Sequence, residues 1–259
     1  MTANKLVLPA PDGPVSAAAA PAGTDKLRSF NTRTPPGKES ATLDSRTASD
    51  GVELCVMRIA RIIALIIACG TALADDSIVV SAFGDSLSAG YGLPENKGFA
   101  PALQTALSDL NVSAEVINAG VSGETSADGL ARVDWMLRKK PDIVIVEFGA
   151  NDMFRGTPIS ETEKNLSEIV ARIQKTGVRV LLAGMEPPAN YNVVHRLRYS
   201  YMYSSIADDY DVPLYPFFLE GVALNPALNL SDGIHPNATG TAIVARNIAP
   251  LVADIAKEL

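Results

Sequence analysis

Short apolar runs rich in β-branched residues recur along the chain from residue 78 onward, and each is followed by glycine or polar residues. Runs of this length between turn residues are typical of buried β-strands. The fifth run is weaker because it contains Pro213, and proline is tolerated only at the start of a strand or at a sheet edge. The sequence therefore predicts five strands, at residues 78–83, 114–118, 143–148, 178–183 and 212–215.

Helical patterns fill the gaps between these runs. The clearest begins at Ser160, where Glu163 completes a capping box, places apolar residues on one face and stops at Gly177. The last begins near Asn237 and is expected to kink or break at Pro250. Because strands alternate with helices, we predict an α/β fold: a three-layer α/β/α sandwich around a central, mostly parallel five-stranded sheet.

The chain before the first strand has a different composition. Residues 1–50 hold six of the 17 prolines and a single aromatic residue, so they bury too little apolar area to offset the entropy of ordering. Residues 57–74 combine a basic start, an uncharged run of 13 residues and an Ala-x-Ala site that ends at Ala74. This is the pattern of a signal peptide, and its apolar run is too short to span a membrane.

We therefore expect a disordered extension over residues 1–56, a signal peptide over 57–74 and one domain over 75–259. Because a signal peptide normally begins at the initiator methionine, our hypothesis is that translation starts at Met57. A weaker alternative is lipoprotein processing at Cys69, since the residues before it loosely resemble a lipobox. The expected product is a soluble monomer in the periplasm or outside the cell, without stable membrane insertion.

Composition narrows the chemistry of that domain. A net charge of -7 at pH 7 argues against binding to nucleic acid or to anionic lipid, because both require a basic surface. The two cysteines, Cys55 and Cys69, precede the domain, so no disulfide is expected within it. Two histidines and no domain cysteine leave too few ligands for a metal site, and no cofactor is expected.

Polar, glycine-containing segments follow the first three predicted strands, and ligands bind at the carboxyl ends of parallel strands. The first segment, Gly-Asp-Ser-Leu-Ser at residues 84–88, would place a serine in a tight turn at a helix N-terminus, which favours negative charge. The second, residues 118–125, contains two glycines, and the third contains Asn151, whose amide can donate a hydrogen bond. Taken singly, each segment is also ordinary turn or helix-capping chemistry.

Near the C-terminus, Asp232 and His235 lie three residues apart in a short loop. A serine nucleophile needs a base to take its proton and a carboxylate to orient that base, and this pair could meet both needs. For the motif alone, a loop histidine that caps the final helix is the simpler explanation. The other histidine, His195, lies in a polar stretch at the start of a helix, and we expect a surface residue. The sequence contains no dinucleotide-binding glycine motif, no phosphate loop and no Gly-x-Ser-x-Gly elbow.

In this order, the four segments resemble the blocks of the SGNH (GDSL) hydrolase family. The resemblance extends across essentially the whole domain and is greatest to the periplasmic acyl-CoA thioesterase, lysophospholipase and arylesterase subgroup. It implies a flavodoxin-like fold with Ser86 as nucleophile, His235 as base and Asp232 as the acid that orients the base. It also implies an oxyanion hole made of the backbone N–H groups of Ser86 and Gly123 and the side chain of Asn151.

The resemblance further implies hydrolysis of carboxylic esters and thioesters, with aryl esters, acyl-CoA and lysophospholipid-like molecules as substrates. The chain departs from the family's pattern at residues 93–97 and 186–187, which we expect to lie where substrate is recognised. Two alternatives stay open: a carbohydrate acetylesterase of the same superfamily and a non-catalytic binding protein. The single tryptophan, Trp135, gives little support for a sugar-stacking cleft, and the complete set of catalytic residue types disfavours a binding protein.

Overall fold

The computed structural model describes residues 77–259 of the chain. The expected extension and signal peptide lie outside the described residues, as do both cysteines. Of the domain expected over residues 75–259, all but the first two residues belong to the described part.

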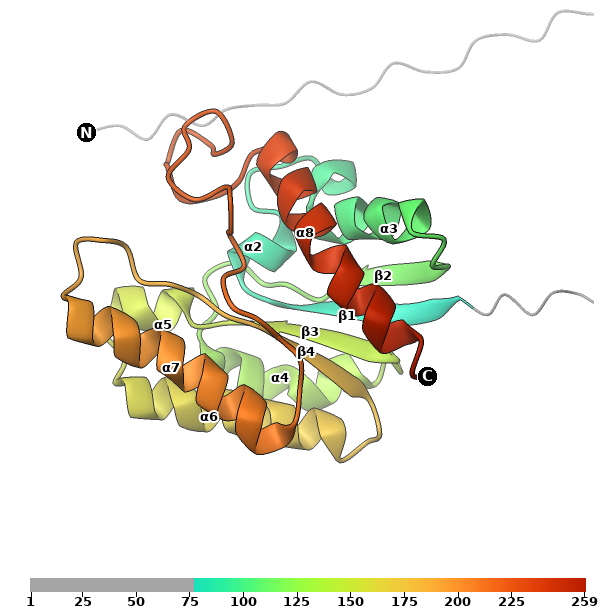
Figure 1. The fold of residues 1–259 in the computed structure, drawn as a ribbon, viewed down its shortest axis with the longest axis horizontal. Helices are drawn as coiled ribbons and strands as arrows, with labels where there is room; N and C mark the ends of the chain where they lie inside the picture. Colours follow the sequence, from blue (N-terminus) through green and yellow to red (C-terminus); the bar gives the residue numbers. More distant parts are fainter. Residues whose placement is uncertain (1–76) are drawn as a thin grey trace, which may run out of the picture. The chain divides into compact units, whose positions relative to one another are not determined.

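The described residues form one five-stranded sheet in the order β2-β1-β3-β4-β5, with every neighbouring pair parallel (Figure 1). This confirms the predicted fold, and the strand order is the flavodoxin-like one. The fifth strand is only two residues long and lies at an edge of the sheet, as the proline before it suggested. The strands are β1 Ile78–Gly84, β2 Ala114–Asn118, β3 Ile143–Glu147, β4 Arg179–Ala183 and β5 Leu214–Tyr215.

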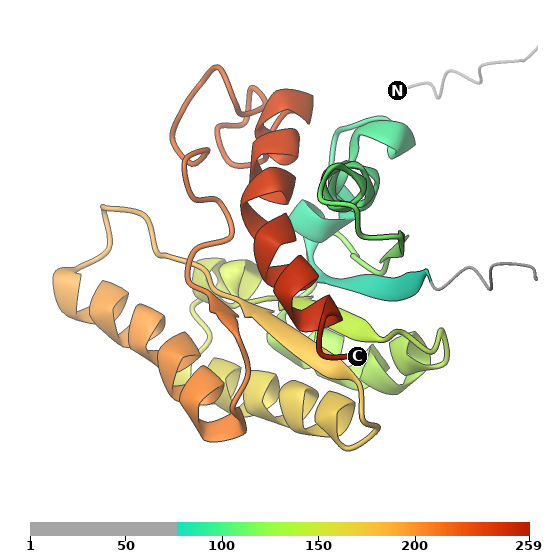
Figure 2. The same ribbon diagram turned by 45° about the vertical axis from the view of Figure 1, so that its right-hand side comes forward.

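Helices cover both faces of the sheet (Figures 1 and 2). Helices α3 and α8 pack against each other on one face, while α4, α6 and α7 form a layer on the other. Since both faces are covered, the central strands are predominantly apolar, and all five residues of β3 are buried, including Glu147 at its end. The helices are α2 Ser86–Ala89, η1 Glu95–Lys97, α3 Phe99–Asp109, α4 Ser126–Leu137, α5 Ala150–Arg155, α6 Ile159–Gln174, α7 Val193–Tyr210 and α8 Ala238–Ala256.

One expectation about helix ends was wrong. Helix α6 has Pro158 as its N-cap and no side-chain cap, so Ser160 and Glu163 form no capping box there. A capping box is instead made by Thr125 and Asp128 at the start of α4, where each side chain accepts the other's backbone N–H. Helix α8 continues through Pro250 without a break, because residues on both sides of the proline are buried against the sheet and α3.

Strand order also explains where the candidate catalytic residues come together. Strand β1 has β2 on one side and β3 on the other, so the connections leaving β1 and β3 run to opposite faces of the sheet. A crevice forms at the carboxyl end of strands at such a switch point. The turn that carries Ser86 follows β1 directly, and α5, which carries Asn151, follows β3.

Candidate active site

Ser86 is the first residue of α2, in the turn that leaves β1. Asp85 is the N-cap, and its Oδ1 accepts the Leu87 N–H at 3.0 Å. Gly84 is required because a Cβ there would meet the Glu147 carboxylate and the Ser88 hydroxyl. The first N–H groups of a helix have no intrahelical acceptor, and no described residue accepts from the Ser86 N–H. The turn thus presents a hydroxyl beside a free backbone donor.

The structure brings Ser86, His235 and Asp232 into one hydrogen-bonded line, although the serine and the histidine are 149 residues apart in sequence. The Ser86 Oγ lies 2.9 Å from the His235 Nε2, and the His235 Nδ1 lies 2.7 Å from the Asp232 Oδ2. This is the order of contacts that a serine nucleophile, its base and an orienting carboxylate require.

The Asp232 carboxylate is held ionised by its own loop. Its Oδ1 accepts the backbone N–H groups of Ile234 and His235 at 2.9 and 3.0 Å. These hydrogen bonds, followed by that to the imidazole, lower the pKa of Asp232 to about 2. The loop is closed by the Leu230 N–H, which donates to the His235 carbonyl at 2.7 Å. The carboxylate therefore remains an acceptor for the imidazole even in acid.

Tyr91 contacts the imidazole of His235 from the solvent side. The two ring centroids are 4.5 Å apart at an interplanar angle of 39°, and the tyrosine is 51% exposed. An aromatic face at this distance stabilises a cationic ring more than a neutral one. Sequence reasoning did not single out this residue, since an exposed tyrosine after a turn carries no distinctive pattern.

Asn151 follows β3 at the start of α5 and lies beside the nucleophile turn. Its Nδ2 donates to the Asp85 Oδ2 and to the Glu124 carbonyl, both at 2.9 Å. The amide is thereby fixed between the loops that leave β1 and β2. Asn151 lines the same cavity as Ser86 and His235.

The two glycines of the loop after β2 have different structural reasons. Gly123 has φ of +85° with open space around its Cα, so its backbone conformation favours glycine. A Cβ on Gly120 would instead meet the backbone of Ser88 and Ala89, so that glycine permits a close approach to α2. The Gly123 carbonyl accepts from the Arg155 guanidinium at 2.6 Å, which ties this loop to α5. Gly123 is held near the crevice but does not line the cavity around Ser86.

Arg132 of α4 ties the same loop to β1. Its Nε forms a 2.6 Å ion pair with Glu124, and a terminal nitrogen donates to the Gly84 carbonyl at 3.2 Å. The guanidinium also lies over the Phe83 ring, 4.5 Å from its centroid. Arg132 and Arg155 are positioning residues that the sequence did not indicate, because both occur in ordinary amphipathic helices.

Two buried carboxyl groups lie close together at the nucleophile turn: Asp85 within the turn and Glu147 at the end of β3. The Glu147 Oε2 accepts the Ser88 hydroxyl at 2.8 Å and the backbone N–H groups of Asp85 and Ser88, both at 3.3 Å. Burial, and then the nearby Asp85 charge, raises the pKa of Glu147 well above its usual value. Burial also raises the pKa of Asp85, to about 6, although its hydrogen bonds and His235 partly oppose the rise. Glu147 was expected only as part of a strand.

A cavity of about 390 Å³ opens beside Ser86, Asn151 and His235. Three further charged residues line it: Asp85 in the nucleophile turn, Glu186 in the connection between β4 and α7, and Arg196 in the first turn of α7. The rest of the lining is predominantly apolar and includes Leu87, Met153, Phe154, Met185, Pro187, Phe217, Leu219, Leu224 and Ile234. The site therefore combines a polar catalytic end with an apolar space.

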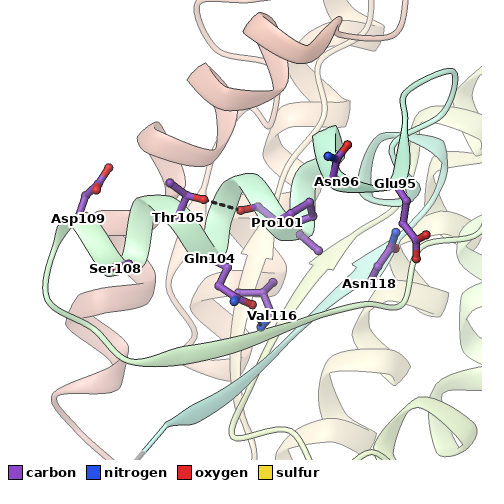
Figure 3. Close-up of a pocket in the computed structure, with 10 residues that line it drawn as sticks. Glu95, Asn96, Pro101, Gln104, Thr105, Ser108, Asp109, Val116 and Asn118 are labelled. Carbon is purple, nitrogen blue, oxygen red and sulfur yellow. Dashed lines mark hydrogen bonds between the residues drawn. The ribbon is translucent and has the colours of Figure 1, made fainter. Parts of the chain in front are cut away.

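A second, larger cavity of about 950 Å³ lies between α3 and the edge strand β2 (Figure 3). Gln104 lines this cavity, and its Oε1 accepts the Val116 N–H at 3.1 Å. Neither Ser86 nor His235 lines it. Glu95 and Asn96 line this cavity and not the one around Ser86. Of the two segments expected to contact substrate, 186–187 reaches the catalytic cavity and 93–97 does not.

His195 is not the surface residue that the sequence suggested. It is half-buried between the rings of Tyr191 and Tyr199, with centroid separations of 5.2 and 5.9 Å. Tyr199 in turn donates its hydroxyl to the Gly149 carbonyl, at 2.6 Å. Among residues 77–259 no cluster of three potential metal ligands occurs, and no helix there is long and apolar enough to cross a membrane.

Comparison with known proteins gives a consistent assignment. Residues 82–243 match the GDSL-like lipase/acylhydrolase family. The chain is 36% identical over 189 residues to Esterase TesA of Pseudomonas aeruginosa, covering 73% of this chain and 92% of the relative. It is 39% identical over 191 residues to Thioesterase 1/protease 1/lysophospholipase L1 of Escherichia coli K12, covering 73% and 85%. The crystal structure of AlinE4, an SGNH-hydrolase family esterase, matches with a TM-score of 0.59 and 41% identity over 69% of this chain and 96% of that one.

Proposed function

The chain belongs to the GDSL-like lipase/acylhydrolase family and is an ester hydrolase, and from that premise we propose that it acts as a serine esterase through Ser86. The observation that carries the proposal is the continuous line from the Ser86 hydroxyl through His235 to Asp232, at 2.9 and 2.7 Å. Both distances are within hydrogen-bond reach, which is the first condition for a general base.

In the proposed reaction, the His235 Nε2 takes the Ser86 proton as the serine oxygen attacks the carbonyl carbon of the substrate. Asp232 keeps the imidazole in the tautomer that carries hydrogen on Nδ1, and it stabilises the imidazolium that forms. The alcohol or thiol leaves with the proton from His235, and Ser86 retains the acyl group. Water then attacks the acyl-enzyme by the same route and releases the carboxylic acid.

We propose the Ser86 and Gly123 N–H groups and the Asn151 amide as the donors to the oxyanion. The Ser86 N–H is free among the described residues and lies at a helix N-terminus, which supports this role. The Asn151 hydrogens already contact Asp85 and Glu124, so a developing oxyanion would share or replace one of these acceptors. Preorganised donors of this kind act most strongly on the charge that develops in the transition state.

The apolar cavity supports esters and thioesters with an acyl chain as the substrate class. Burying a methylene group contributes about 0.8 kcal/mol, so each carbon that enters the cavity strengthens binding until the space is filled. Aryl esters, acyl-CoA and lysophospholipid-like molecules are therefore our proposed substrates. Sugar acetates would leave most of the apolar lining without a partner.

We also propose export, with cleavage near Ala74, and a mature soluble monomer in the periplasm or outside the cell. The basic, apolar and Ala-x-Ala sequence of residues 57–74 supports this proposal. Intact-mass analysis of the protein made from its native gene tests it, because a mature form that retains residues before Met57 contradicts the proposed start and the proposed cleavage.

The function is tested by a chain-length series of p-nitrophenyl esters and acyl-CoA thioesters with the wild type and Ser86→Ala. We expect acyl chains longer than acetyl to be preferred and the variant to lose activity by several orders of magnitude. A fluorophosphonate probe should label the wild type and not the variant. Near-normal turnover by Ser86→Ala would refute the nucleophile, while a preference for acetyl-xylan would identify a carbohydrate esterase instead.

A further inference from the structure

Helix α7 is apolar on two opposite sides. Its inner side, which includes Tyr199 and Tyr203, is buried against α6 and the sheet. Its outer side also carries large apolar residues, at spacings that align them along the helix, and no described residue covers them. These residues are 65–71% exposed, and together we call them the α7 face: Val193, Val194, Leu197 and Tyr201.

The mouth of the catalytic cavity is a second exposed apolar surface. Phe154, Leu224 and Ile234 line that cavity and are 52%, 79% and 49% exposed, and we call these three residues the cavity rim. The α7 face and the rim together hold seven of the twelve large apolar residues that are exposed among residues 77–259. Such gathering, in contrast to scattered exposure, marks an interaction surface.

The two surfaces are connected. The Tyr191 hydroxyl, in the loop that leads into α7, donates to the Met153 carbonyl of α5, next to Phe154. Arg196 lines the cavity and precedes Leu197 of the α7 face in sequence. A partner seated on the α7 face would therefore also reach the entrance of the catalytic cavity.

The charge around the α7 face differs from that of the whole chain. The net charge of the chain is -7, yet no aspartate or glutamate occurs from residue 187 to residue 207. From the neighbouring helix α6, Glu163 lines a pocket with Arg198 and Tyr201, but it forms no ion pair with a described residue. On a helix of 3.6 residues per turn, Arg196 and Arg198 lie on opposite flanks of the apolar stripe. Neither guanidinium forms an ion pair with a described residue. On a phospholipid surface, such an apolar stripe can contact the acyl chains while the arginines on either side of it reach the headgroup phosphates.

We propose that the α7 face and the cavity rim dock this protein onto a phospholipid surface with zwitterionic headgroups, from which acyl substrates enter the catalytic cavity. The flanking arginines would pair with headgroup phosphates while the apolar stripe enters the boundary with the acyl chains. We choose zwitterionic lipid as the partner because the net charge of the chain is -7. A strongly anionic membrane would attract the two arginines but repel the rest of the protein. The delivery step rests on the proposed esterase function, but the docking step does not.

Docking is tested by flotation of the full protein with phosphatidylcholine vesicles. The test variant Val194→Gln/Leu197→Gln/Tyr201→Gln changes only exposed side chains, and the matched control Leu110→Gln/Trp135→Gln changes apolar residues that are 44% and 54% exposed elsewhere. We expect the test variant to lower the partition coefficient at least about tenfold, since binding scales with inserted apolar area. The control should stay within about twofold of wild type. Arg198→Glu should also weaken partitioning.

The same proteins are assayed on micellar lysophosphatidylcholine and on soluble p-nitrophenyl acetate. We expect the test variant to lose micellar hydrolysis in proportion to partitioning and to keep the soluble activity. The proposal is overturned if wild type does not partition, if the control loses as much as the test variant, or if the test variant instead abolishes a dimer. Absence of hydrolysis of both esters by a wild type that still partitions would refute the proposed function and leave docking intact.

Discussion

Replacing Glu147 with glutamine isolates the energetic effect of a carboxyl group buried beneath a catalytic turn. The side chain is fully buried, and its Oε2 accepts three hydrogen bonds, from the Ser88 hydroxyl and from the N–H groups of Asp85 and Ser88. Its Oε1 has no partner among the described residues. A glutamine can present its oxygen to the same three donors, so Glu147→Gln removes the ionisable proton while it keeps the acceptor and the shape.

The raised pKa of Glu147 decides whether the free energy of unfolding rises or falls with pH. In the folded protein, burial and the nearby Asp85 charge keep the Glu147 carboxyl protonated, whereas in the unfolded chain it ionises above its ordinary pKa of 4.5. The unfolded state then binds fewer protons, so the free energy of unfolding falls as pH rises from 4.5 toward the folded pKa. The slope is about 1.4 kcal/mol per pH unit for one group. The stability present below pH 4.5 is thus progressively lost above it.

Glu147→Gln should therefore become more stable relative to wild type as pH rises. The difference in free energy of unfolding should grow by about 1.4 kcal/mol per pH unit above 4.5 while the wild-type carboxyl stays protonated. Urea denaturation at a series of pH values measures it, with Glu115→Gln on the exposed side of β2 as the control for loss of one carboxyl. A difference that does not change with pH would refute the reasoning, because any packing defect of glutamine adds only a constant offset.

The remaining predictions concern the catalytic groups and the loop after β2. Asn151→Ala should lower kcat by about 10²–10³-fold, measured on an aryl ester, while circular dichroism shows an unchanged fold. Asp232→Asn should lower kcat by up to about 10⁴-fold on the same ester. Because the pKa of Asp232 is about 2 in the wild type, the pH–rate profile should show no loss from protonation of this carboxylate well above that pH. Gly120→Ala should destabilise the fold by about 1–3 kcal/mol in urea denaturation, because a Cβ there meets the backbone of α2; an unchanged midpoint would contradict that contact.

The strands and the proximity of Ser86 and Asn151 could be predicted because they depend on local patterns and one general rule, whereas the role of His235 beside Ser86 was implied by the resemblance to the SGNH family. Apolar runs identify buried strands, and parallel strands bring the segments that follow them to one edge. Glu147 could not be predicted in the same way. Its register partner on β1 is Gly84, and the missing side chain of that glycine leaves the space that the carboxyl fills. Such a pairing is decided by strand register, which no single segment encodes.

Helix ends were predicted less well because competing caps have similar local sequences. Ser160 and Glu163 fit a capping box, but the N-cap of α6 is Pro158, two residues before Ser160, and that box is unused. Pro250 lacks an N–H and should weaken a free helix, yet α8 continues because Ile248 and Val252 on either side of it are buried. At Pro250, tertiary packing outweighs a local preference of about 3 kcal/mol.

The carboxyl pair also explains how the donors and the nucleophile keep their spacing. Asp85 links the two, since one of its oxygens caps α2 and the other accepts from the Asn151 amide. Glu147 holds the same turn from below through Ser88. Burying two acids costs stability at neutral pH, but replacing Glu147 with alanine would leave three buried donors unsatisfied, at about 1–3 kcal/mol each. Glutamine should thus relieve the pH-dependent cost and keep the turn, whereas alanine should lose both stability and activity.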